Sequence, residues 1–137
     1  MQTTFTVTTS GPGLYEITEQ VARWLEPEAE GLLTLMVRHT SASLLIQENA
    51  DPDVQRDLQA FFARAVPRSD DPSMSYLHHT MEGPDDMPAH IKASMLPVSL
   101  SIPVRSGRMA LGTWQGIYLF EHRDAPHTRQ VALHFSR

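Results

Sequence analysis

The sequence predicts a single α+β domain over residues 1–137, in which two to three helices pack on one mixed, largely antiparallel β-sheet. Three observations support this prediction. Of the 137 residues, 41% are hydrophobic, which is enough for one core in a chain of this length. Strand and helix patterns alternate in the first part of the chain, whereas three strand patterns follow one another at its end. No repeat, low-complexity tract or linker divides the chain.

The first 25 residues are predicted to form two strands and a helix. Residues 2–9 are rich in threonine and alternate polar and apolar side chains, which is typical of a strand. The Ser-Gly-Pro-Gly run at residues 10–13 predicts a turn. Residues 14–17 fit a short second strand that completes a hairpin, and the spacing of the following apolar residues predicts a helix over residues 18–25.

The middle of the chain is predicted to contain a central strand and a long helix. Residues 32–38 are strongly apolar, which indicates a central strand, and residues 44–46 resume extended structure after a run of small residues. A helix is expected to begin at Pro52, because Asp51 is a good N-cap residue and proline suits the first helical position. The apolar face of this helix ends just before Pro67.

The second half of the chain is predicted to form a loop, a short helix and three strands. Residues 68–76 are polar and indicate a loop. Acids and prolines at residues 83–88 predict the start of a helix that reaches about residue 95. Ser106-Gly107 is typical of a tight hairpin turn. The three strands are expected at residues 98–104, 109–122 and 129–135.

Composition and charge exclude several functional classes. The chain has no cysteine, so disulfides, cysteine-based zinc sites and thiol catalysis are excluded. Its net charge of −5 does not favour binding to nucleic acid or to an anionic membrane, so a phosphate ligand would need a local cluster of basic groups or a metal. The N-terminus lacks a secretory pattern, and no apolar stretch approaches the roughly 18 residues of a membrane span. We therefore expect a soluble, cytoplasmic protein.

Histidine is the residue type that offers most chemistry in this chain. The seven histidines are the only soft metal ligands and the only proton carriers near neutral pH. Their spacing matches no compact zinc motif, so a three-histidine site would have to be assembled by the fold. Taken one at a time, each is more simply explained as a capped or surface residue. Four lie at the ends of predicted elements or beside acidic turns: His39, His79, His90 and His122.

Two other places in the sequence are candidates for binding. Asp51 is accounted for by helix capping, which leaves Glu48 as the better functional candidate in that acidic segment. Trp114 and Gln115 lie between two glycines inside a predicted strand. Glycine within a strand indicates a bulge or the close approach of another chain segment, which here would be a ligand or a subunit neighbour.

Several longer segments form one recognisable set. They are His39-Thr40-Ser41-Ala42-Ser43-Leu44, Glu48-Asn49-Ala50-Asp51-Pro52, His79 with residues 82–92, residues 112–117 (Gly-Thr-Trp-Gln-Gly-Ile), and Glu121-His122-Arg123. Together they resemble the YjbQ-type family, whose members are named as secondary thiamine-phosphate synthases. The resemblance implies an α+β subunit with a mixed sheet, assembled as a homotrimer. Apolar surface for such a trimer is expected on the strand that carries Trp114, Tyr118 and Phe120.

The resemblance also implies an activity, the joining of hydroxymethylpyrimidine diphosphate to a thiazole phosphate with release of pyrophosphate. Such a reaction needs a cationic cradle for the leaving group, usually a divalent metal with Arg or Lys. The metal, zinc or magnesium, is expected on His79, His90 and His122. Catalytic roles are expected for His39, Glu48 and Asp86. Contacts to the substrate or its phosphate are expected from Lys92, Arg108, Arg123, Trp114 and Gln115.

Two alternatives remain open at this point. A non-catalytic trimer that binds a metal or a small phosphorylated metabolite would carry the same residues, and no nucleophile or triad is visible beyond the ligands. The histidines could also bind phosphate directly as imidazolium ions. The two kinds of ligand predict opposite pH dependences. The affinity for a metal falls as the pH falls, whereas the affinity of imidazolium for phosphate rises.

Overall fold

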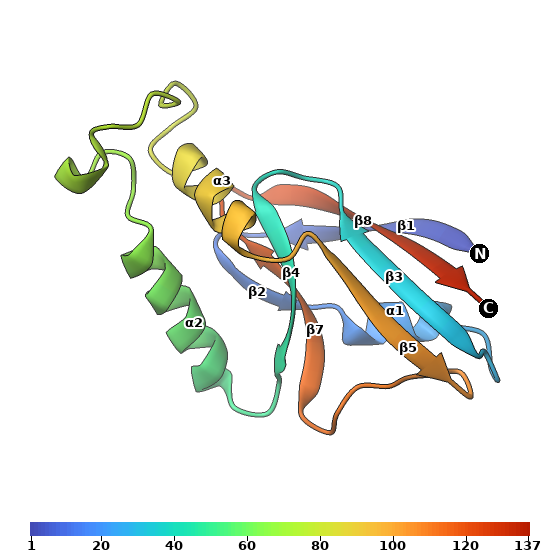
Figure 1. Cartoon of the computed structure of the whole chain (residues 1–137). Coiled ribbons are helices and arrows are strands. Elements are labelled where there is room, and N and C mark those ends of the chain that lie inside the picture. Colours follow the sequence, from blue (N-terminus) through green and yellow to red (C-terminus); the bar gives the residue numbers. More distant parts are fainter.

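Two antiparallel β-sheets form the framework of the computed structural model, which describes residues 1–137 (Figure 1). The five-stranded sheet has the order β1 (Gln2–Thr9), β8 (His127–Ser136), β3 (Gly31–Val37), β5 (Ser99–Arg105) and β6 (Arg108–Met109). The three-stranded sheet has the order β2 (Gly13–Glu16), β7 (Gln115–Glu121) and β4 (Ala42–Glu48). Every strand pair is antiparallel.

The α+β class is confirmed, and β3 is the central strand of its sheet as predicted. The strands nevertheless form two sheets and include no parallel pair. A parallel pair needs a long crossover within one sheet, whereas the helical connections of this chain lead from the three-stranded sheet to the five-stranded one. Residues 38–41, between β3 and β4, carry the chain back in the other direction.

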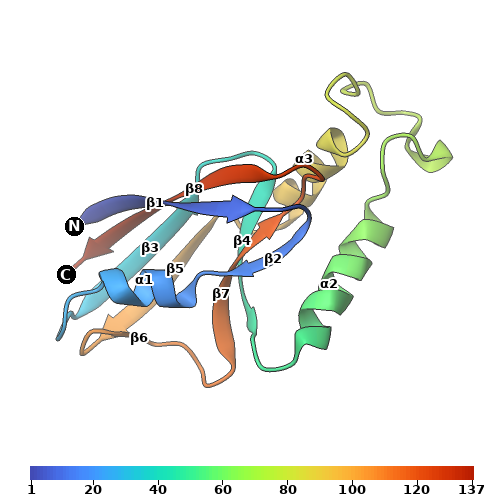
Figure 2. The ribbon, with the colours of Figure 1, turned by 180° about the vertical axis from the view of Figure 1, so that it is seen from behind.

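Three α-helices and one 3-10 turn complete the fold: α1 (Thr18–Trp24), α2 (Pro52–Ala65), η1 (Pro72–Met74) and α3 (Asp86–Met95). α2 and α3 lie at the end of the molecule away from the two termini, and α1 lies in front of the five-stranded sheet in Figure 2. α2 begins as predicted, because the Asp51 side chain accepts a hydrogen bond of 2.9 Å from the N–H of Asp53. None of these helices combines the length and apolar character needed to cross a membrane.

A single hydrophobic core of 17 buried residues joins both sheets and α1. Alternate residues of β3 and β8 are buried, so one face of the five-stranded sheet is turned to this core. Leu33 and Leu35 of β3 and Ile117 and Leu119 of β7 are completely buried. Each such side chain contributes about 1.5–3 kcal/mol on burial, so the core holds the strand ends in fixed positions.

The predicted strand at residues 109–122 is broken in the structure. β6 ends at Met109, and β7 begins at Gln115 in the other sheet. The side chain of Gln115 closes the turn between them, because its Oε1 accepts a 2.7 Å hydrogen bond from the N–H of Gly112. The preceding hairpin is as predicted, since Ser106 and Gly107 have positive φ angles of 50° and 75°, as a two-residue hairpin turn of type I′ requires.

The two ends of the chain lie side by side in the five-stranded sheet (Figure 1). β8 pairs with β1 on one side and with β3 on the other, so Leu133 lies opposite both Thr3 and Leu35. The N-terminal ammonium group of Met1 also donates a 3.1 Å hydrogen bond to the backbone oxygen of Phe135. The C-terminal strand therefore occupies an interior position in the sheet.

A buried ion pair joins the two sheets where β7 ends. Glu121 of β7 and Arg129 of β8 are both buried, and Arg129 Nε lies 2.8 Å from Glu121 Oε1. Thr9 of β1 donates a 2.7 Å hydrogen bond to the same carboxylate, and Arg129 donates a 2.9 Å hydrogen bond to the hydroxyl of Ser41. These contacts fix the point at which the chain leaves β7 and enters the candidate site.

Candidate metal centre

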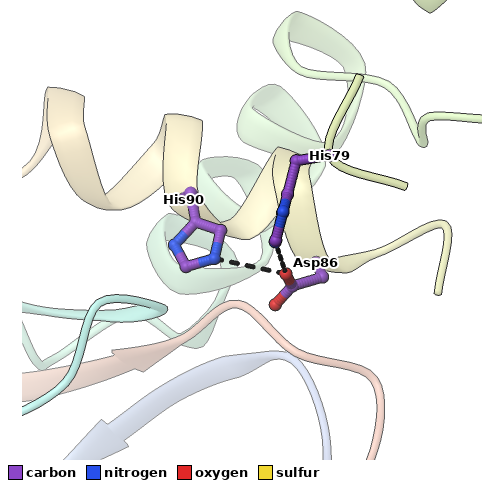
Figure 3. A group of neighbouring side chains, drawn as sticks. All are labelled: His79, Asp86 and His90. Atoms are coloured by element: carbon purple, nitrogen blue, oxygen red, sulfur yellow. Dashed lines mark hydrogen bonds and ion pairs between the residues drawn. The ribbon is translucent and has the colours of Figure 1, made fainter. Parts of the chain in front are cut away.

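Three ligand-type side chains converge at the start of α3 (Figure 3). Asp86 and His90 are four residues apart on this helix, so they lie on the same side of it. His79 comes from the preceding segment and points at the same carboxylate. Asp86 Oδ2 is 2.8 Å from His79 Nε2 and 3.2 Å from His90 Nε2. The three ligand atoms all lie within 4.8 Å of one another, which is compatible with a shared metal ion.

A main-chain contact sets the orientation and tautomer of His90. Its Nδ1 lies 3.0 Å from the backbone oxygen of Thr40, which follows β3. A carbonyl oxygen only accepts hydrogen bonds, so Nδ1 carries a proton. In neutral His90, Nε2 is therefore a bare lone pair that faces the carboxylate of Asp86. Two electron-rich atoms in that arrangement require a cation, either a proton or a metal ion.

The carboxylate of Asp86 is held in place by Arg123. Asp86 is 2% exposed, and its Oδ1 lies 2.9 Å from Arg123 Nη1. Arg123 also binds Asp85 Oδ2 at 2.8 Å and the backbone oxygen of Glu82 at 3.2 Å. Burial alone would raise the pKa of Asp86, but its hydrogen bonds and the adjacent positive charges hold the pKa below its ordinary value. Asp86 is therefore ionised, with Oδ2 directed at the two imidazoles.

The cluster is open on one side. The side chain of His79 is 50% exposed, and Glu82 Oε2 lies 3.5 Å from His79 Nε2 at the exposed edge. Two imidazoles and one carboxylate with an accessible fourth side are the donor arrangement of catalytic zinc sites. The same donors suit magnesium poorly, because magnesium prefers oxygen ligands.

Comparison with known proteins assigns this chain to a family. The family model described as "UPF0047 protein YjbQ-like" matches residues 3–137. The chain belongs to this family. A UPF0047 protein of Synechocystis is 48% identical over 132 residues, which cover 95% of this chain and 87% of the relative. The YjbQ protein of Salmonella typhimurium is 46% identical over 133 residues, which cover 95% and 93%.

Solved structures agree with the family assignment. A conserved hypothetical protein of Thermus thermophilus superposes on this chain with a TM-score of 0.85 at 33% identity, covering 98% of this chain and 99% of that one. A hypothetical protein of Aeropyrum pernix gives a TM-score of 0.86 at 29% identity, covering 99% and 98%. These comparisons establish the YjbQ-like fold over the whole chain, and none of the names states an activity.

In this YjbQ-like protein, the predicted ligand His122 lies apart from the cluster. It is 3% exposed, and its Nε2 is 2.9 Å from the hydroxyl of Ser43 on β4. Its ring packs on that of Phe120, with the centroids 4.6 Å apart. Asp86, which was expected in a catalytic role, takes the third position beside His79 and His90.

His39, which is expected in a catalytic role, also lies outside the cluster. Its Nε2 accepts a 2.8 Å hydrogen bond from the backbone N–H of Gln130. Burial, followed by the positive charge of Arg129, lowers the pKa of His39, so the imidazole is neutral at pH 7. His39 and His90 line one shallow pocket, but the nitrogen that would most readily bind a metal is used to hold β8.

Three of the predicted residues lie at the far end of β4 and β7. Glu48 is the register partner of Gln115, whereas Ala42 at the other end of β4 pairs with Glu121. Six residues of strand separate these ends by about 20 Å. Glu48 Oε2 accepts a 3.2 Å hydrogen bond from the N–H of Asp51, so it orders the turn before α2. Trp114 and Gln115 therefore lie far from the metal cluster of the same chain.

The remaining basic residues fall into two groups. Arg108 is exposed on β6, at the edge of the five-stranded sheet, and has no contact with the cluster. Arg123 is in the cluster, where it binds carboxylates. Lys92 lies on the next face of α3, beside a separate pocket.

Sequence reasoning missed the ion pair of Glu121 and Arg129. The signal was present, because Glu121 follows four consecutive apolar residues of a strand, and a carboxylate buried there needs a cationic partner. Its partner lies in the following strand, which belongs to the other sheet, and the packing of the two sheets brings the two side chains together.

Proposed function

We propose that this protein is a metal-dependent enzyme acting on a small phosphorylated metabolite. The main support for this proposal is that His79 Nε2, His90 Nε2 and Asp86 Oδ2 converge on one point. The oxygen of Thr40 orients the lone pair of His90 towards that point. The donor set favours zinc over magnesium. A bound divalent ion would supply Lewis-acid stabilisation of negative charge on phosphate oxygens.

The protein's own groups have distinct positioning roles in this proposal. Arg123 keeps Asp86 ionised and aimed at the ligands. Thr40 fixes the tautomer of His90, as the second hydrogen bond of a metal-bound histidine commonly does. Glu82, at the exposed edge beside His79, is placed to accept or hold a proton.

The specific reaction we propose to test is thiamine phosphate synthesis. In this reaction the thiazole nitrogen forms a bond to the methylene carbon of hydroxymethylpyrimidine diphosphate, and the carbon–oxygen bond to the diphosphate breaks. Pyrophosphate leaves with the bonding electrons. Support comes from the motif resemblance and from a cation site beside Arg123, the elements that a departing diphosphate requires.

Metal content tests the first half of the proposal. The protein purified without a histidine tag is expected to retain about one zinc ion per chain. His90→Ala and Asp86→Asn should lose most of it, because each removes a ligand. His134→Ala is the matched control, since His134 is exposed on β8 and the only hydrogen bond of its side chain is with the hydroxyl of Ser136. Equal metal content in the His90→Ala protein and the control would contradict the assignment.

Turnover tests the second half. The zinc-loaded protein, given both thiamine precursors, should form thiamine phosphate and pyrophosphate faster than the His90→Ala protein. If metal binds but neither precursor is consumed, the specific reaction is rejected. Recovery of an unchanged phosphorylated compound from the purified protein would then favour the binding-protein alternative.

A further inference from the structure

A second pocket lies on the neighbouring face of α3. It has a volume of about 190 Å³ and is enclosed by α2, α3 and the end of β7. From α3 and its N-cap it takes Asp85, Pro88 and Lys92, which recur at helical spacing on one face. Ligand pockets for drug-sized molecules are about 300–1,000 Å³, so this one suits a small group.

The pocket is separate from the metal cluster but adjacent to it. Asp85 borders the pocket and Asp86 belongs to the cluster, and successive helical residues point about 100° apart. Arg123 lies between them and binds both carboxylates. A ligand group held in the pocket would therefore lie beside the metal centre without using its ligands.

The charged groups in the wall are paired, with one exception. Asp85 is paired with Arg123, Asp124 with Arg68 at 2.5 Å, and Glu121 with the buried Arg129. Lys92 is half-buried and lines the pocket, yet it forms neither a hydrogen bond nor an ion pair. It is also the only lysine among the 11 basic residues of the chain. Its compact ammonium group is thus a free positive charge inside the pocket.

His122 supplies a second unpartnered group. Its ring lines the same pocket, and its Nδ1 is the only buried side-chain nitrogen or oxygen in the structure that has no hydrogen-bond partner. A buried polar atom of this kind costs stability unless a ligand satisfies it. When the hydroxyl of Ser43 donates to Nε2, the ring proton lies on Nδ1. His122 then presents an N–H donor near the ammonium group of Lys92.

We propose that this pocket binds a phosphate group, with Lys92 providing the charge and His122 Nδ1–H a hydrogen bond. The inference deepens the proposed function, because it places the phosphate of the metabolite beside the metal cluster. Binding to the pocket does not require the metal, however. The two ideas can therefore fail independently.

The single lysine allows a direct test on the wild-type protein. The full-length chain is labelled with isotopic lysine, stripped of metal with a chelator and titrated with inorganic phosphate, and with glycerol phosphate in a second series. The one lysine side-chain signal should shift in a saturable manner in at least one series. The series that binds more tightly distinguishes free phosphate from a phosphate monoester. An unchanged lysine signal in both series overturns the proposal.

Variants give a quantitative check by calorimetry. Lys92→Met keeps an unbranched side chain that is one atom shorter and removes the charge, so phosphate binding should weaken about tenfold or more. Lys92→Arg should retain most of the affinity. Arg105→Met is the matched control, because it removes one charge from an exposed position on β5. When metal has been removed from both proteins with a chelator, His90→Ala and the wild type should bind phosphate equally, which separates this site from the metal site. Equal phosphate affinity in Lys92→Met and Arg105→Met would also overturn the proposal.

Discussion

His122 is the residue whose surroundings most change its chemistry. Burial, with a further contribution from the positive charge of Lys92, lowers its pKa to about 3. The nearby carboxylate of Glu121 opposes this effect but is itself paired with Arg129. A histidine in this position stays neutral under physiological conditions. It can therefore donate a hydrogen bond to a ligand without adding a second buried positive charge beside Lys92.

The low pKa of His122 predicts a specific loss of stability in mild acid. Below pH 6.5 the unfolded chain takes up a proton at this residue, and the folded chain does not until about pH 3. The free energy of unfolding should therefore fall with the pH across this window, by about 2 kcal/mol between pH 7 and pH 5. Denaturant titrations at the two pH values would measure it.

The control for this pH effect is another histidine. His122→Gln should reduce the loss between pH 7 and pH 5 by about 2 kcal/mol and leave the contribution of His39, whose pKa burial also lowers, whereas His134→Gln, on the exposed side of β8, should keep the whole loss. The carboxylates titrate mainly below this window, so they do not mask the comparison. An identical pH dependence in both variants would refute a neutral, buried His122.

At the scale of elements, α3 presents two different faces to two different sites. One face carries Asp86 and His90, and the adjacent face carries Asp85 and Lys92. The position of the helix depends on contacts with β7 and with the β3–β4 connection, through Arg123 and Thr40 respectively. The end of β7, which the ion pair of Glu121 and Arg129 fixes, therefore supports both sites.

Breaking that ion pair should destabilise the whole fold. Arg129→Met would leave Glu121 as a buried, unpaired carboxylate, which costs about 3–5 kcal/mol of unfolding free energy. Adding Glu121→Gln to this variant should recover part of the loss, because it removes the stranded charge. Denaturant unfolding measures both. Arg137→Met is the control, since its pair with Glu26 is exposed and should contribute less than about 1 kcal/mol. Equal losses in the two single variants would contradict this assignment.

Local signals in the sequence were sufficient for some elements and not for others. Asp51 and Pro52 marked the start of α2 correctly, because capping involves only adjacent residues. Asp86 and His90 are also four residues apart in the sequence, a local relation that brings them together on α3, but the predicted ligand set joined His90 to His122 instead. The direction of the His122 side chain depends on its contact with Ser43 of another strand, which no local pattern specifies. The break before Gln115 is closed by a local hydrogen bond to Gly112, which the apolar pattern of residues 109–122 did not indicate.

At the scale of the whole molecule, part of the apolar surface has no partner within the chain. Trp114 is 63% exposed, Phe61 61% and Met81 94%, and no residue of α2 is fully buried. Tyr118 and Phe120, which were expected to contribute to a subunit contact, are instead buried within the chain. Trp114 remains the residue of that strand region available to a partner.

We expect the protein to be a trimer in solution. Light scattering at micromolar concentration should give a mass three times the chain mass of 15.4 kDa. Trp114→Asp should shift the distribution towards the monomer if this side chain is covered in the assembly, because a carboxylate is costly to bury. Arg105→Asp provides an exposed control on another strand. A monomer mass for the wild-type protein would rule the trimer out.

The interior position of β8 also governs when this fold can form during synthesis. β1 and β3 are not neighbours in the sheet, because β8 lies between them and pairs with both. β8 begins more than 90 residues after the start of β3. Until residues 127–136 have left the ribosome, both strands present unpaired edges, and such edges favour wrong pairing. Completion of the five-stranded sheet therefore waits for residues 127–136 and is reached through distant contacts that close slowly.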